Sequence, residues 1–106
     1  MGPAVAAKRQ AIEAAILSRN LLQVRGRGLT RIVEPYLLYE SKAGALILHS
    51  WQVAGEFEES CPPDWCDLRL DEIYAVTVLD KRYERPHPDY NPNSKRFHRV
   101  IVYTPK

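Results

Sequence analysis

The sequence predicts a mainly β domain, a small antiparallel barrel preceded by one α-helix. Three observations lead to this prediction: an alanine-rich segment opens the chain, five or six short β-like runs follow it, and short turns join most of the runs. Hairpin connections are typical of antiparallel sheets, because parallel strands need long crossovers. The chain has 106 residues, 45% of them hydrophobic, which is enough for a single domain with its own core.

Residues 4–19 are expected to form the helix. Alanine is the best helix former, and the apolar residues Val5, Ile12 and Ile16 fall near one side of a helix drawn through this segment. Asn20 is a plausible end for it. A short amphipathic helix of this kind normally packs its apolar stripe against a sheet, so we expect a packing role.

Residues 21–80 are expected to form the barrel. The runs expected as strands are 21–27, 30–40, 45–54, 66–72 and 73–79. Glycines in Arg25-Gly26-Arg27-Gly28 favour a tight hairpin after the first run. Pro35 cannot donate a ladder hydrogen bond, so it marks an edge, a bulge or a bend in the second run. In the third run the face of Leu46 and Leu48 turns polar, and we expect it to leave the core near Ser50.

Residues 81–106 are expected to form an extended arm and a last strand. Three prolines lie within 81–95 among basic and polar residues, which favours an arm that runs over the surface. Strand character returns at 97–103. An acidic loop at 55–65 carries the pair Pro62-Pro63, which bars regular pairing there.

Charge is distributed unevenly along the chain, although the net charge is only +2. The segment up to Arg31 carries +5, residues 32–80 carry −8, and the rest carries +5. If the two basic ends meet in the fold, one face would attract phosphate. The alternative is solvated charge spread around a small surface.

No apolar run approaches the length of about 18 residues needed to cross a bilayer, so we expect a cytoplasmic protein with no membrane contact. Enzyme motifs are also missing: the sequence has no glycine-rich phosphate loop, no nucleophile elbow and no His-Glu pair at the spacing that binds a metal on a helix. We therefore expect no enzymatic activity and no cofactor.

Cys61 and Cys66 are the two cysteines of the chain. Their spacing allows a disulfide, two metal ligands or a redox pair, and two free thiols in a reducing compartment are the default. A zinc site needs about four ligands and no second cysteine pair exists, so no metal site is expected.

Two motifs, in this order and spacing, resemble the WYL domain of bacterial transcription regulators. They are Arg-Ile-Val-Glu-Pro at 31–35 and Leu-Arg-Leu-Asp-Glu-Ile at 68–73, and the similarity extends over roughly residues 9–85. Two positions differ from the family pattern: the Trp-Tyr-Leu tripeptide falls on Leu-Ile-Leu at 46–48, and Glu72 stands where arginine is usual. No helix-turn-helix segment precedes the motifs, so we expect an isolated module.

This resemblance implies an Sm/SH3-like barrel that senses a ligand. It implies single-stranded nucleic acid or a nucleotide-type ligand, and a role in bacterial transcription or defence-system regulation. Arg31 and Arg69 match the recurrent arginines of the family. His49 and Trp51 follow the tripeptide, where the family often has polar and aromatic pocket residues.

Each candidate residue also has a structural interpretation. Arginine suits phosphate because its planar fork makes bidentate bonds, but Arg31 can pair with Glu34, and Arg69 with a neighbouring acid. Trp51 can stack on a base or belong to the core, and His49 can be a hydrogen-bonded structural histidine.

Arg25 and Arg27 flank the expected hairpin tip. They can contact phosphate there, or they can simply be solvated, as most charges on turns are.

A second function remains open from the sequence. The acidic loop and the exposed strand edges can recruit a regulatory protein partner or a second copy of the chain, giving a homodimer. In that case the protein is an interaction or oligomerisation module without a nucleic-acid ligand.

Overall fold

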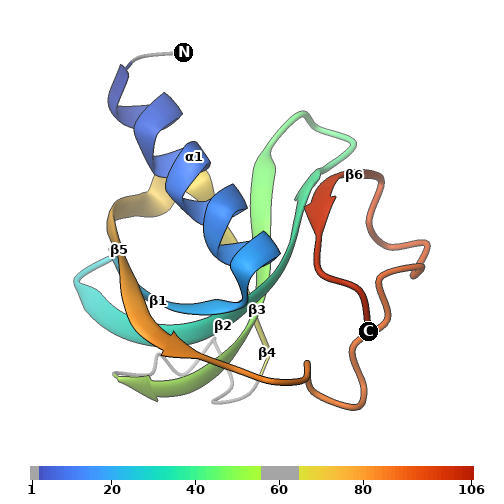
Figure 1. Cartoon of the computed structure of the whole chain (residues 1–106). Coiled ribbons are helices and arrows are strands. Elements are labelled where there is room, and N and C mark those ends of the chain that lie inside the picture. The colour runs from blue at the N-terminus through green and yellow to red at the C-terminus, as the bar shows by residue number, and fades with distance from the viewer. Residues whose placement is uncertain (1–2, 56–64) are drawn as a thin grey trace.

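The computed structural model describes residues 3–55 and 65–106, with side chains from Ala6 onward. The elements, in chain order, are α1 (Pro3–Ser18), β1 (Asn20–Gly26), β2 (Leu29–Glu40), β3 (Leu46–Gly55), β4 (Trp65–Arg69), the 3₁₀ turn η1 (Leu70–Glu72), β5 (Ile73–Arg82) and β6 (Arg99–Tyr103). Strands therefore dominate, with one helix at the N-terminal end, as the sequence predicts (Figure 1).

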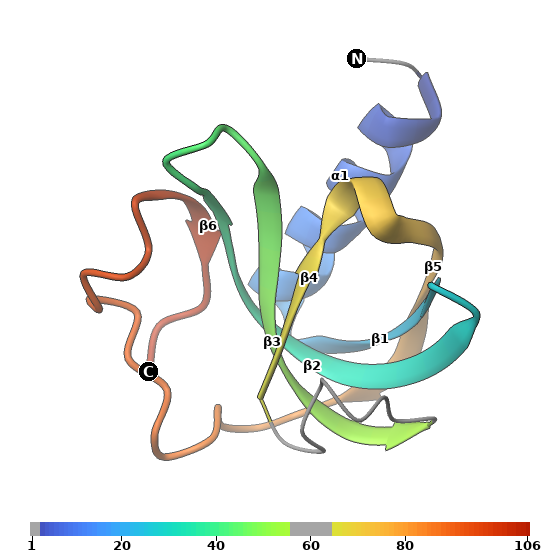
Figure 2. The same ribbon diagram turned by 180° about the vertical axis from the view of Figure 1, so that it is seen from behind.

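The strands form one antiparallel sheet in the order β4-β3-β2-β1-β5, with β6 paired to β2. Strand β2 is the longest, and it changes neighbour along its length. Residues 29–33 pair with β1, whereas residues 37–40 pair with β6. The sheet is strongly curved (Figure 2). Among the described strands β4 and β5 do not pair, so the sheet is not closed and the predicted barrel is not confirmed.

A first core lies between α1 and the sheet. The buried helix residues Ile12, Ala15 and Ile16 pack there against apolar side chains from β1, β2 and β3. The helix ends where Arg19 adopts a left-handed conformation with φ of 62°. The helix thus has the packing role that its sequence indicates, and it lies across the sheet in Figure 1.

A second core lies between the sheet and the C-terminal arm, residues 83–98. Tyr90 and Phe97 of the arm are buried against β2 residues Tyr36, Leu37 and Tyr39. The arm does more than run over the surface, because it covers a sheet face that would otherwise expose several aromatic rings. Both faces of β2 are therefore buried from residue 36 to residue 39.

Pro35 lies where β2 changes neighbour. The β2–β3 register shifts between Pro35 and Leu37, which confirms the bulge or bend predicted there. The arm and the residue after β6 supply hydrogen bonds to the backbone here. The Tyr83 hydroxyl of the arm donates to the Pro35 carbonyl at 2.7 Å, and the Thr104 amide donates to the Tyr36 carbonyl at 2.8 Å.

The buried tyrosine hydroxyls stay protonated donors. The Tyr90 hydroxyl donates to the carbonyl oxygens of Thr104 and Tyr36, at 2.9 and 3.2 Å. Burial raises the pKa of both Tyr83 and Tyr90 far above the ordinary tyrosine value. Their hydrogen bonds to β2 therefore persist at any ordinary pH.

Two local predictions were wrong. The run 66–72 is not one strand, because the strand ends at Arg69 and the chain continues as η1. The Lys8 ammonium donates to the carbonyls of Leu70 in η1 and of Ile73 at the start of β5. The third strand does not leave the core at Ser50, which is fully buried and donates its hydroxyl to the Cys66 carbonyl at 2.7 Å. Gln52 is also buried, whereas Val53 on the other face is exposed.

No helix in the described part of the chain is both long and apolar enough to span a bilayer.

Substituting Gly26 tests the close approach of β1 to η1. A Cβ at Gly26 would lie 2.4 Å from the Glu72 carbonyl oxygen, and that oxygen belongs to the backbone and cannot turn away. We expect Gly26→Ala to lower the free energy of unfolding by roughly 1–3 kcal/mol, measured by urea denaturation. The comparison variant is Lys42→Ala, at an exposed position in the turn between β2 and β3. Unchanged stability in Gly26→Ala would contradict this packing.

Candidate functional site

The β1–β2 hairpin turns through Arg27 and Gly28, both with positive φ, 55° and 77°. A two-residue turn with positive φ at both positions is the type I′ hairpin, which prefers Asn-Gly or Gly-Gly. An arginine is strained in this conformation. A strained residue often marks a functional position, so the presence of arginine here favours a role for its guanidinium.

An open hollow of about 350 Å³ lies beside this turn, lined by residues 25–30 and Tyr74. Arg25 pairs with Ala75 in the β1–β5 register, which brings Tyr74 next to the turn. The Tyr74 residue is 85% exposed, although it is one of the large rings of the protein. Two arginines and an exposed aromatic ring thus share one concave surface.

A second, much smaller cavity of about 10 Å³ adjoins the first and is lined in part by Arg27, Arg31, Arg69 and Glu72. The structure therefore brings the two predicted family arginines together. They differ in access, because Arg31 is 2% exposed whereas the Arg69 side chain is 53% exposed. The cavity has room for about one water molecule, so a larger ligand would meet Arg69 at the surface and not Arg31.

Exposed acids lie close to these arginines. Arg69 pairs with Asp71 at 3.0 Å and Arg27 with Glu72 at 3.7 Å, and all four side chains are about half exposed. Exposed pairs of this kind contribute little to stability, so a phosphate can replace the carboxylates at small cost. We call Arg25, Arg27, Arg69 and Tyr74 the basic end of the sheet. Figures 1 and 2 show its place in the fold, where the β1–β2 turn lies beside the start of β5.

His49 and Trp51 lie elsewhere. In the β2–β3 register Gly55 lies opposite Arg31, whereas His49 lies opposite Leu37. Six residues of strand separate these two positions along β3. His49 lines a hollow with residues of the arm, and Trp51 stacks on His87 of the arm. The six predicted binding residues therefore do not form one site: four gather at the hairpin end of the sheet, and two belong to another region.

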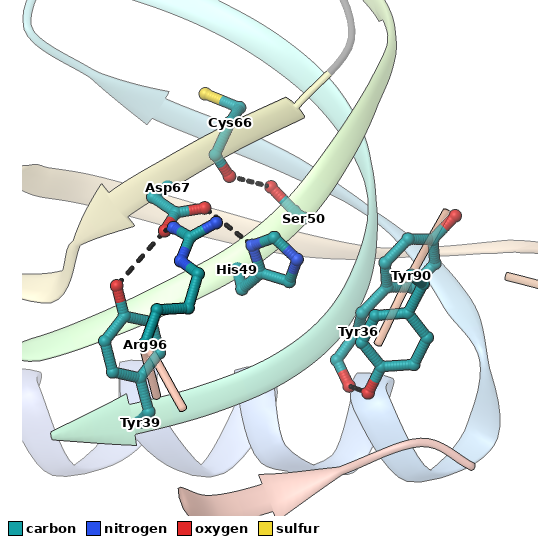
Figure 3. Close-up of polar contacts among 8 residues, drawn as sticks. All are labelled: Tyr36, Tyr39, His49, Ser50, Cys66, Asp67, Tyr90 and Arg96. Atoms are coloured by element: carbon teal, nitrogen blue, oxygen red, sulfur yellow. Dashed lines mark hydrogen bonds and ion pairs between the residues drawn. The ribbon is translucent and has the colours of Figure 1, made fainter. Parts of the chain in front are cut away.

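His49 forms a polar cluster with Asp67, Tyr39 and Arg96 (Figure 3), in which His49 and Tyr39 are buried while Asp67 and Arg96 are partly exposed. Nδ1 of His49 lies 2.7 Å from Oδ1 of Asp67, and the His49 side chain is only 5% exposed. The other Asp67 oxygen accepts hydrogen bonds from the Tyr39 hydroxyl, at 3.1 Å, and from the Arg96 guanidinium. The cluster joins β2, β3 and β4 to the arm.

Burial by itself raises the pKa of the Asp67 carboxyl, but its partners reverse the effect. The hydrogen bond and charge of His49, the charge of Arg96 and the Tyr39 hydroxyl together hold the pKa below its ordinary value. Burial, followed by the Asp67 charge, raises the pKa of Tyr39. Asp67 is therefore ionised at neutral pH and accepts a hydrogen bond from each partner.

Aromatic rings surround this cluster. The Trp65 ring stacks on His49 with centroids 4.8 Å apart and planes 8° from parallel, and Phe97 packs at 4.9 Å. Trp51 is partly buried, stacked on His87 at 3.9 Å and edge-on to Trp65 at 5.1 Å. Trp51 thus belongs to the second core, and His49 has the hydrogen bond expected of a structural histidine.

A hollow of about 170 Å³ lies beside His49, and we call it the histidine hollow. Its lining residues are His49, Trp65, Asp89, Asn91, Ser94, Arg96 and Phe97. Five of them follow residue 88, so the arm forms most of the wall.

Sequence reasoning missed the arm residues, Asp67 and Tyr74. Nothing in the spacing of Asp67 and Arg96 along the chain indicates that they meet at His49. Tyr74 did carry a signal, because it is the large aromatic residue that alternates outward between Ile73 and Ala75 in a predicted strand.

Several predictions fall outside the described residues. Cys61 and most of the acidic loop, residues 56–64, lie there, and Cys66 is buried. Within residues 3–55 and 65–106, no group of three histidine, cysteine or acidic side chains is arranged to hold a metal ion.

No family model, curated protein or solved structure matches this chain.

The variant Arg27→Asn tests the strain in the hairpin turn. Asparagine tolerates the left-handed conformation better than arginine, and the exposed pair with Glu72 contributes little. We expect the free energy of unfolding to rise by roughly 0.5–1 kcal/mol, measured by urea denaturation. A loss of stability would show that the Arg27 side chain is needed for the fold.

The variant Asp67→Asn tests the polar cluster through its pH dependence. Because the folded pKa of Asp67 lies below the unfolded one, its stabilisation is full above the ordinary value of 3.8 and is lost as the pH falls through the folded value. We expect Asp67→Asn to be less stable than wild type at neutral pH and to lose less stability on acidification. Asp89→Asn, which alters a carboxyl that is 80% exposed, is the control, and an equal change in both variants would contradict the assignment.

Proposed function

We propose that this protein is a WYL-like regulatory module that binds single-stranded nucleic acid or a nucleotide-type ligand at the basic end. The observation that carries the proposal is the open hollow of about 350 Å³ lined by Arg25, Arg27 and the 85% exposed Tyr74. In this assignment the arginines contact phosphate and the tyrosine stacks on a base.

The charge of the basic end supports phosphate binding. Arg25 and Arg27 are exposed, and Arg69 lines the adjoining small cavity with Arg27. One guanidinium group can donate two hydrogen bonds to the oxygens of one phosphate. Three arginines spaced along one surface therefore suit a nucleic-acid backbone with successive phosphates. Arg31 has a supporting role in this proposal, because it is buried beneath the surface that the ligand would contact.

Tyr74 supports a ligand that contains bases. A ring that is 85% exposed contributes little to the core, and its apolar surface is in unfavourable contact with water. Stacking of a base on such a ring contributes about 1–3 kcal/mol in single-strand binders and tolerates any sequence. Tyr74 also borders a second hollow, of about 280 Å³, that is lined in part by Lys8 of α1, whose ammonium group donates to the Leu70 and Ile73 carbonyls.

The arginines are tested by fluorescence anisotropy with short single-stranded DNA and RNA oligomers at two salt concentrations. We expect the double variant Arg25→Ala/Arg27→Ala to bind more weakly and to show a shallower salt dependence, by about 0.7 in the log–log slope for each phosphate that the variant no longer neutralises. The control is Lys42→Ala/Lys81→Ala, which removes the same charge from exposed positions distant along the strands. Equal losses in both double variants would indicate a general charge effect, and absence of binding by wild type at low salt would refute the proposal.

The stacking role is tested by Tyr74→Ala against Tyr103→Ala. Tyr103 is also an exposed tyrosine on a strand, at 51%, but it lies on β6. We expect Tyr74→Ala to weaken oligomer binding by about tenfold and Tyr103→Ala to leave it unchanged. Unchanged affinity in Tyr74→Ala would remove the base-stacking part of the proposal.

A further inference from the structure

The histidine hollow is a second candidate site that the basic end does not use. We propose that it binds an uncharged nucleobase or nucleoside, independently of phosphate. The inference rests on a buried imidazole with one nitrogen available, on the mixture of polar groups in the wall, and on the aromatic rings that flank it.

His49 presents a fixed hydrogen-bonding atom. Ionised Asp67 can only accept, so Nδ1 of His49 donates to it and Nε2 is left for another partner. Figure 3 shows the second nitrogen on the side of the ring away from Asp67. The His49 side chain is 95% buried and lines the hollow, so Nε2 is placed to contact a ligand there. A polar group of a ligand in the hollow would form a hydrogen bond with this nitrogen.

The arm adds both donors and acceptors. Oδ1 of Asn91 accepts the Asn93 amide at 3.0 Å, which leaves the NH₂ group of Asn91 as a donor. Ser94 contributes a hydroxyl, and Arg96 a guanidinium that is half exposed beyond its bond to Asp67. Together these side chains can form hydrogen bonds with the donor and acceptor groups along the edge of a base.

The local charges disfavour an anion. Asp67 and Asp89 supply two negative charges at this place, against one positive charge on Arg96. A phosphate or carboxylate would gain little from such surroundings, in contrast to the basic end. An uncharged ligand with polar edges fits them better.

Size and shape limit the ligand further. The volume of about 170 Å³ is below the roughly 300–1,000 Å³ of pockets for drug-sized molecules, so it suits one ring system. The Trp65 and Phe97 rings form part of the wall. Planar heterocycles gain stacking energy against such rings.

The experiment is ¹H–¹⁵N NMR titration of the full chain with adenine, cytosine, uracil and their nucleosides, with ribose and inorganic phosphate as comparison probes. We expect saturable shifts of the Trp65 indole and the Asn91 side-chain amide with at least one base, and none with phosphate or ribose. This readout needs no variant, so it is unaffected if His49 variants fail to fold.

A matched pair of arm variants then tests the contact. Asn91→Asp keeps an oxygen acceptor for the Asn93 amide but removes the NH₂ donor, whereas Asn93→Asp places the same charge two residues away, outside the lining. We expect Asn91→Asp to weaken base binding by about tenfold or more, the loss of one hydrogen bond to a buried partner, and Asn93→Asp to leave it unchanged. Equal effects of the two variants would overturn the assigned contact.

Failure here is distinguishable from failure at the basic end. Absence of saturable shifts with every base, or binding of ribose or phosphate instead, would overturn this inference and leave the oligomer experiments untouched. Arg25→Ala/Arg27→Ala should retain base binding at the hollow. Loss of it in that variant would place the base at the basic end and overturn the separate site.

Discussion

The rest of the structure depends on one constraint: the buried backbone carbonyl groups of β2 around Pro35 need hydrogen-bond partners. The proline and the bulge beside it interrupt the ladder at the point where β2 leaves β1 and has not yet reached β6. Buried carbonyl groups left without partners would cost free energy. The Tyr83 and Tyr90 hydroxyls of the arm supply those partners, together with the amide of Thr104 after β6. The arm must therefore return to this point of the sheet.

That return explains why the protein has two cores and two candidate sites. Once the arm is attached at β2, Tyr90 and Phe97 cover the sheet face opposite α1, and Arg96 reaches Asp67. The histidine hollow exists because the arm passes over β3 and β4 at this place. The basic end belongs to the other half of β2, where the hairpin, η1 and β5 meet without help from the arm.

The two regions differ in what they offer a ligand. At the basic end the charged side chains are exposed, and one of them lies in a backbone conformation that suits glycine or asparagine better. At His49 a buried imidazole is held by hydrogen-bonded neighbours that are themselves partly exposed. Exposed arginines suit a charged, extended ligand, whereas a small hollow with an ordered polar wall suits a small one.

The sequence by itself determined the helix, the approximate strand positions, the tight turn near Gly28, the irregularity at Pro35 and the outward direction of Arg69. These features follow from local effects: helix propensity, strand alternation, glycine's freedom at positive φ and proline's missing N–H. Only the tertiary structure decided that Ser50 and Gln52 are buried, that residues 70–72 form a 3₁₀ turn, and that Arg31 lies beneath Arg69. It also decided that Asp67 and Arg96, 29 residues apart, meet at His49. Such contacts depend on which strand faces and arm residues share one volume, and no local pattern encodes that information.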